Sequence, residues 1–73
     1  MIFKSKVLEI YMDAAPYISN VNWVKNVIFK ALNESNNIEE FEKKINRLYE
    51  KQEEIVKKND LKIFLIFLKK RLK

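Results

Sequence analysis

The side chains of this chain that could do chemistry are carboxylates, amines and a few hydroxyls, because the sequence contains neither histidine nor cysteine. Seven glutamates and Asp60 lie between positions 34 and 60, and such a cluster could bind a divalent cation or act as an acid–base pair. In a helix, however, four of these glutamates lie four residues before a lysine, as Glu39 does before Lys43, which is typical of a solvated, ion-paired surface. The sequence therefore predicts no metal site, no cofactor and no catalytic residue, and we expect a protein that is not an enzyme.

Residues 38–58 carry the most regular apolar pattern of the chain. The positions of this pattern alternate three and four residues apart and are Ile38, Phe41, Ile45, Leu48, Gln52 and Ile55. This spacing places one stripe along one helical face, so we predict a long helix over residues 37–58. Gln52 is the polar member of the stripe. It could fix the register of a dimer by forming hydrogen bonds with Gln52 of the second copy, or it could lie at the edge of the packed region and reach solvent.

The first half of the sequence predicts two helices. Apolar spacing over residues 2–14 favours a helix that Pro16 terminates, because proline disfavours helical geometry in the residue before it. The β-forming residues at positions 7–12 leave a strand as the alternative for that segment. A second helix is predicted over residues 20–33, after a polar capping residue.

The last helix is expected over residues 61–72. Asn59 and Asp60 are predicted to end the preceding helix, and Asp60 to cap the first turn of the last one. The first two turns of this helix are apolar apart from Lys62. A helix that is apolar on every side is normally buried, so we expect the C-terminal helix to lie in the core.

Together these segments predict an all-α fold, a single domain over residues 1–73 with four helices. A chain of this length without cysteine has no disulfide to stabilise a small core. The helices also present more apolar surface than one small bundle can bury, so we expect a homodimer. The residues predicted to form the core or the dimer contact are Ile38, Phe41, Ile45, Leu48, Gln52, Ile55, Phe64 and Phe67.

Two aromatic residues of the second helix are candidates for binding another protein. Trp23 and Phe29 point in different directions around a helix, so the core of one chain is expected to cover only one of them. Exposed tryptophan and phenylalanine are frequent anchors at interfaces between proteins. The leading hypothesis is a non-catalytic adaptor or regulatory protein that acts through contacts with another protein.

The charge distribution supports two alternatives. Residues 61–73 carry five bases and no acid, within a chain of net charge +5. A DNA-binding regulator could use this basic end with part of the second helix, and its candidate residues are Lys25, Lys30, Lys69, Lys70, Arg71 and Lys73. An apolar helix with a basic end could instead associate with an anionic membrane surface. No apolar run approaches the roughly 20 residues that cross a bilayer and no signal peptide is recognisable, so we expect a cytoplasmic protein.

Overall fold

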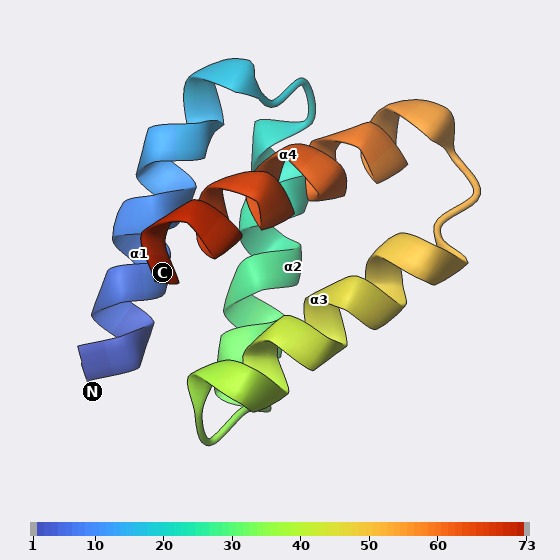
Figure 1. Ribbon diagram of the computed structural model, residues 1–73. Coiled ribbons are helices and arrows are strands. Elements are labelled where there is room, and N and C mark those ends of the chain that lie inside the picture. The colour runs from blue at the N-terminus through green and yellow to red at the C-terminus, as the bar shows by residue number, and fades with distance from the viewer. Residues whose placement is uncertain (1, 73) are drawn as a thin grey trace.

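The computed structural model describes residues 2–72, which form four α-helices and one short 3-10 helix (Figure 1). In chain order these are α1 (Ile2–Ala14), η1 (Ala15–Tyr17), α2 (Val21–Asn33), α3 (Ile38–Lys51) and α4 (Ile55–Leu72). The predicted all-α fold is confirmed, and no strand occurs in residues 2–72. The alternative of a strand over residues 7–12 is wrong, because that segment is the middle of α1.

The third and fourth helices meet at a different place from the one predicted. The helix expected over residues 37–58 ends at Lys51, and the helix expected over residues 61–72 begins at Ile55. Asp60, which was expected to cap the last helix, therefore lies inside it.

A short turn at residues 52–54 separates α3 from α4. Gln52 has extended backbone dihedrals, φ −71° and ψ 125°, and these end α3. The Gln52 side-chain oxygen accepts a hydrogen bond from the Glu54 N–H at 3.1 Å. The Glu54 carbonyl then accepts the first hydrogen bond of α4, from the Lys58 N–H at 2.9 Å. The polar member of the apolar stripe is thus the residue at which the chain turns.

A reciprocal cap fixes the start of α3. Asn37 Oδ1 accepts a hydrogen bond from the Glu40 N–H at 2.9 Å, while Glu40 Oε1 accepts one from the Asn36 N–H at 2.8 Å. The two side chains therefore satisfy two backbone amides at the helix start, where amides have no partner within the helix. Glu39 and Glu40 in the first turn also suit the positive end of the helix dipole.

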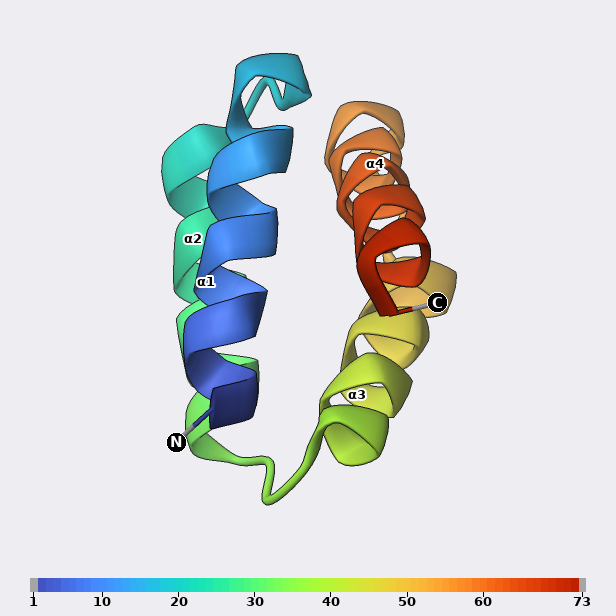
Figure 2. The same cartoon turned by 60° about the vertical axis from the view of Figure 1, so that its left-hand side comes forward.

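The core lies where α4 packs against α1 and α3. Figure 2 shows α1 beside α2 on one side of the molecule and α3 and α4 on the other. The buried apolar side chains come from all four helices and the α1–α2 connection, and they are Val7, Ile10, Ala14, Ile18, Val24, Ile28, Ala31, Leu32, Phe41, Ile45, Leu61, Phe64, Leu65 and Leu68. Phe64 meets Phe41 edge to face, with 6.1 Å between ring centroids. The predicted position of the C-terminal helix in the core is confirmed.

Asp60 ties α4 to the connection between α1 and α2. Its carboxylate is buried and accepts hydrogen bonds from the Ser19 N–H (3.0 Å), the Asn20 N–H (2.8 Å) and Asn20 Nδ2 (3.1 Å). These donors come directly before α2, where the helix dipole also favours a negative charge. Asp60 therefore stabilises the start of α2 from a neighbouring helix, instead of capping its own.

Candidate binding groove between α2 and α3

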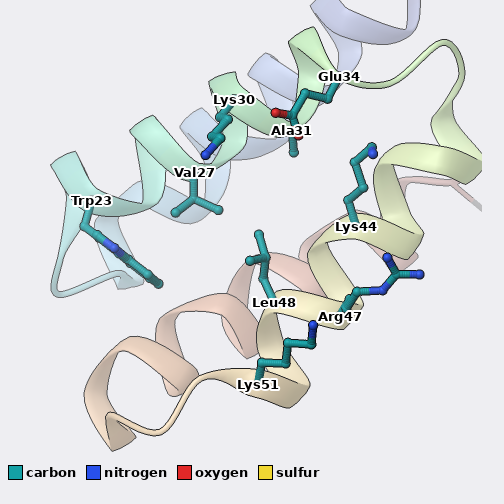
Figure 3. A pocket seen from close by; sticks show the side chains of 9 residues that line it. All are labelled: Trp23, Val27, Lys30, Ala31, Glu34, Lys44, Arg47, Leu48 and Lys51. Carbon is teal, nitrogen blue, oxygen red and sulfur yellow. The ribbon is translucent and has the colours of Figure 1, made fainter.

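A hollow of about 460 Å³ lies between α2 and α3, and we call it the α2–α3 groove. The residues that line it are Trp23, Val27, Lys30 and Ala31 of α2, Glu34 directly after that helix, and Lys44, Arg47, Leu48 and Lys51 of α3. In Figure 3, Val27 of α2 and Leu48 of α3 point toward each other across the space between the two helices, whereas Arg47 points away from Leu48. Two amphipathic helices joined by a short polar turn thus form the walls of the groove.

The floor of the groove is apolar. On α2, Trp23, Val27 and Ala31 recur every four residues and so share one helical face. Ala31 is buried, whereas Trp23 and Val27 are half-buried. Leu48 lies across from them on α3 and is 43% exposed. Apolar surface from two helices is therefore open at this place.

Cations surround this floor. Lys30, Lys44, Arg47 and Lys51 are the positive lining residues, and Glu34 is the negative one. Among the side chains that the structure describes, none of these four cations lies within 4.0 Å of a carboxylate oxygen. The rim therefore carries positive charge that no ion pair within residues 2–72 neutralises.

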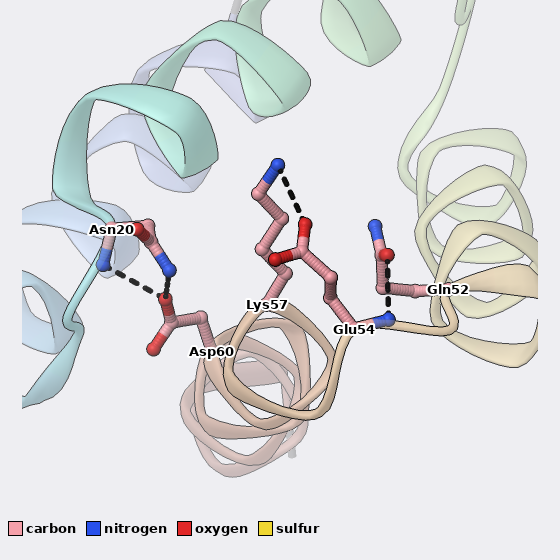
Figure 4. Close-up of polar contacts among 5 residues, drawn as sticks. All are labelled: Asn20, Gln52, Glu54, Lys57 and Asp60. Atoms are coloured by element: carbon pink, nitrogen blue, oxygen red, sulfur yellow. Dashed lines mark hydrogen bonds and ion pairs between the residues drawn. The ribbon is translucent and has the colours of Figure 1, made fainter.

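Trp23 is also in contact with α4. The Lys57 Nζ lies 5.0 Å from the centroid of the indole ring, a cation–π geometry. The same ammonium lies 3.1 Å from Glu54 Oε2, in the turn before α4, and Figure 4 shows this ion pair together with the bonds between Asn20 and Asp60. The turn at residues 52–54 thus places a cation over the ring of the largest groove residue.

A second hollow of about 410 Å³ adjoins the first along α3. It is lined by Glu34, Glu40, Lys43, Lys44 and Arg47, and three of these residues line both hollows. The Glu40 carboxylate is already an acceptor for the Asn36 N–H in the cap of α3. Positive side chains therefore follow α3 from its second turn to its end.

The sequence model of the MJ1579 family matches residues 4–73 of this chain, a range that includes every residue lining the groove. A relative from Methanocaldococcus jannaschii, the uncharacterized protein MJ1579, is 39% identical to the chain over 67 residues, which cover 90% of either protein. The chain belongs to the MJ1579 family. No solved structure matches it.

In this MJ1579-family protein the two predicted protein anchors lie in different places. Trp23 lines the α2–α3 groove, whereas Phe29 is outside it and is 41% exposed. The Lys25 Nζ lies 5.6 Å from the centroid of the Phe29 ring. Of the two candidates, Trp23 is therefore the one that lies in a groove.

The cations predicted to bind nucleic acid lie in several surroundings. Lys25 and Lys30 are both on α2, and Lys30 is on the rim of the groove. At the end of α4, Arg71 forms an ion pair with Asp13 of α1. The remaining three are Lys69 and Lys70, which are exposed, and Lys73, which lies outside the described residues.

The residues expected in the core or at a dimer contact divide into two groups. Those in the core or packed against it are Phe41, Ile45 and Phe64, which are fully buried, and Ile38 and Phe67, which are half-buried. Leu48 lines the groove, Gln52 lies in the turn, and Ile55 is 84% exposed. None of these last three is in the core of the chain: Leu48 faces the groove, and the turn interrupts the stripe at Gln52, before Ile55.

Six groove residues are absent from the sequence-based site, and three of them are cations of α3, Lys44, Arg47 and Lys51. They lie next to Leu48 or one turn from it on α3, and this spacing is visible in the sequence of the MJ1579-family protein. In the heptad pattern they belong to the solvent side of an apolar stripe. Only the packing of α2 against α3 reveals the hollow that they surround.

Acidic side chains of this family member do not gather into a site within residues 2–72. No group of three or more carboxylates there is arranged to hold a metal ion. Glu54 pairs with Lys57, Asp13 pairs with Arg71, and Asp60 accepts backbone N–H groups. None of the helices described is long and apolar enough to cross a membrane.

Proposed function

We propose that this protein is a non-catalytic adaptor or regulator that binds a segment of another protein in the α2–α3 groove. The observation that carries the proposal is the apolar floor of Trp23, Val27 and Leu48, which lies open between two helices. Hydrophobic grooves of this kind accept the apolar face of a short helix from a partner. Binding removes that surface from water, at a gain of about 25 cal/mol per Å² before the costs of association.

Trp23 is the expected centre of the contact. Tryptophan is enriched among the interface residues whose replacement by alanine costs about 2 kcal/mol or more of binding energy. The Lys57 ammonium already lies over the indole ring, so ordering this side chain on binding costs little further entropy.

The composition of the groove supports binding without catalysis. Glu34 is the carboxylate among the lining residues, and the chain contains no histidine or cysteine. One exposed carboxylate beside lysines provides neither an acid–base pair nor a nucleophile with an adjacent base. An adaptor or regulator needs neither.

A selection of displayed random peptides, each of about 12 residues, against the full chain tests the proposal. We expect the selected peptides to carry apolar residues at helical spacing, as helix-in-groove ligands do. Calorimetry is expected to show at least a roughly tenfold loss of their affinity in the variant Leu48→Ala.

The matched control for this variant is Ile66→Ala. Ile66 is 45% exposed, close to the 43% of Leu48, but it lies on α4 and does not line the groove. Selected peptides that bind both variants equally well would contradict the proposed site, and so would failure to select any peptide that depends on Leu48.

The homodimer and the two alternative functions remain predictions. For the dimer, Ile55 and Val56 offer exposed apolar surface at the start of α4, and sedimentation at tens of micromolar tests it. DNA binding has less support than protein binding, because Arg71 is already paired with Asp13. Membrane-surface association has less apolar surface to use, since Phe64 and Leu68 are fully buried.

A further inference from the structure

We infer that the segment bound in the α2–α3 groove is acidic: a short amphipathic helix whose apolar side chains meet Trp23 and Leu48 and whose carboxylates meet the cationic rim. This inference rests on the proposed function, because it names the chemistry of the partner at the same site. The four cations that would receive the carboxylates are Lys30, Lys44, Arg47 and Lys51.

The charge on the rim is the first argument. Four of the nine lining residues are cations and one is a carboxylate, so the groove has a clear excess of positive charge. Two cations elsewhere in the described residues form ion pairs, Lys57 with Glu54 and Arg71 with Asp13, whereas exposed lysines such as Lys62 form none. The rim differs from the rest of the surface in that four cations gather around one hollow. The four rim cations have no such partner within residues 2–72. An interface of complementary charge would pair them and would also accelerate association.

The position of the charges relative to the floor is the second argument. On α3, Leu48 lies one turn from Lys44 and one turn from Lys51, so apolar and cationic side chains alternate along the wall. An amphipathic helix with apolar residues one turn apart and carboxylates beside them presents the complementary pattern. A neutral helix would cover the floor but would leave the rim cations without partners.

The length of the groove sets the length of the segment. The lining residues of α2 and its C-terminus run from Trp23 to Glu34, which at about 1.5 Å per residue corresponds to about 16 Å. A partner helix of about three turns covers that distance. A peptide of about 12 residues is therefore long enough to carry the whole recognition element.

The apolar floor separates an acidic protein segment from a nucleic acid. Phosphate contacts depend on cations and require no apolar surface, so a nucleic acid would leave Val27 and Leu48 unused. Dependence of binding on both Leu48 and the rim cations is thus expected of the acidic helix.

Three synthetic peptides of about 12 residues test the inference on the full chain. Each carries leucines at positions i, i+3 and i+7, and the positions between them are glutamate, glutamine or lysine. Trp23 is the only tryptophan of the chain and lines the groove, so its fluorescence reports binding. We expect the glutamate peptide to bind at least about tenfold more tightly than the glutamine peptide, and the lysine peptide to bind most weakly.

Two triple variants with the same change in net charge sharpen the test. The groove variant is Lys44→Gln with Arg47→Gln and Lys51→Gln, and the control is Lys62→Gln with Lys69→Gln and Lys70→Gln on α4. The groove variant is expected to bind the glutamate peptide no more tightly than the glutamine peptide. The control variant is expected to keep most of the preference, because none of its three lysines lines the groove and salt screens charges that make no direct contact.

The outcomes separate the inference from the proposed function. Equal binding of the glutamate and glutamine peptides, or no binding of the glutamate peptide, overturns the acidic partner. The proposed function then still stands if displayed peptides of other composition depend on Leu48. Tighter binding of a 12-nucleotide single strand than of the glutamate peptide, unchanged in Leu48→Ala, also overturns the inference and favours a nucleic acid.

Discussion

Where α4 crosses the end of α1, the aromatic and charged side chains of the two sides are paired with each other. Tyr17 stacks on Phe67 with 5.6 Å between ring centroids, and Arg71 pairs with Asp13. Where α2 runs beside α3, the facing side chains leave a hollow of about 460 Å³. Its apolar floor is partly exposed, and its cations have no carboxylate partner within the described residues.

Two other carboxylates, Asp60 near the start of α4 and Glu34 in the groove, show the same difference. Asp60 is 1% exposed and accepts three hydrogen bonds that join α4 to the start of α2. Glu34, the carboxylate of the groove, is exposed among cations and takes part in no ion pair within residues 2–72. Around α4, polar and apolar groups contact each other and stabilise the fold. In the α2–α3 groove, such groups are exposed without a partner in the described residues, which is why we propose that binding occurs there.

The largest effect expected from this comparison is on stability. Phe64→Ala removes a fully buried ring that meets Phe41, so we expect a loss of about 3 to 5 kcal/mol in the free energy of unfolding. Leu48→Ala in the groove should cost about 1 kcal/mol or less, because that side chain is already half in water. Urea unfolding followed by circular dichroism measures both.

The loss in Phe64→Ala approaches the whole stability of a chain this short, which at about 0.05 to 0.15 kcal/mol per residue is roughly 4 to 11 kcal/mol. Phe64→Leu is therefore a useful second variant, since it keeps most of the apolar volume and should remain folded. Equal costs for Phe64→Leu and Phe64→Ala, or a larger cost for Leu48→Ala, would contradict the assignment of core and groove.

The next largest effect concerns the buried carboxylate. Asp60→Ala leaves the Ser19 and Asn20 N–H groups without their acceptor, and we expect a loss of about 2 to 3 kcal/mol. Asp60→Asn keeps one acceptor oxygen and should lose less. The control is Asp13→Asn, an exposed carboxylate whose replacement should cost about 1 kcal/mol or less. If the losses in Asp60→Ala and Asp13→Asn were similar, Asp60 would not be the link between α4 and α2.

The first two helices could be predicted from the sequence because their ends are set locally. Pro16 ends the helix expected over residues 2–14, and α1 ends at Ala14. The polar residues 33–37 separate the second helix from the third, and α2 ends at Asn33. Signals of this kind act within a few residues and do not depend on what the helix packs against.

The turn between α3 and α4 could not be placed in the same way. Glutamine and glutamate are good helix formers, so residues 52–54 give no local signal for a break. The apolar pattern does hold a weaker one: in one straight helix Leu61 would lie roughly 160° around the axis from Ile45, at about 100° per residue. Both are fully buried, so one straight helix would have to be packed on two nearly opposite faces. This mismatch favours a break between them but does not say where.

The groove was predicted only in part. Trp23 was a candidate anchor and Lys30 a candidate cation, but nothing in the sequence joined the two. Their proximity to Leu48 depends on how closely α2 packs against α3, which is a tertiary property. The excess of charge at the C-terminal end drew attention to Arg71 instead, and the structure shows Arg71 in an ion pair with Asp13.

A smaller effect tests whether Lys57 orders the Trp23 side chain in the groove. Lys57→Ala removes the cation over Trp23, and we expect a loss of about 0.5 to 1 kcal/mol together with a red shift of the tryptophan emission, as the indole gains water. The control is Lys62→Ala, an exposed lysine on the same helix. An emission spectrum unchanged by Lys57→Ala would show that Lys57 does not shield the ring. The groove would then lack the contact that orders Trp23.

The smallest effect compares a cation that forms an ion pair, Arg71, with a cation of the groove rim that forms none, Lys44. Arg71 and Asp13 are both partly exposed, so a double-mutant cycle with Arg71→Gln and Asp13→Asn should give a coupling of about 0.2 to 1 kcal/mol. The coupling should shrink at 1 M salt, where the Debye length is about 3 Å. Lys44→Gln on the groove rim should change stability by less than about 0.5 kcal/mol at either salt concentration. If Lys44→Gln cost as much as Arg71→Gln and showed the same salt dependence, the rim cations would already be engaged within the chain. A partner would then gain little by pairing with them.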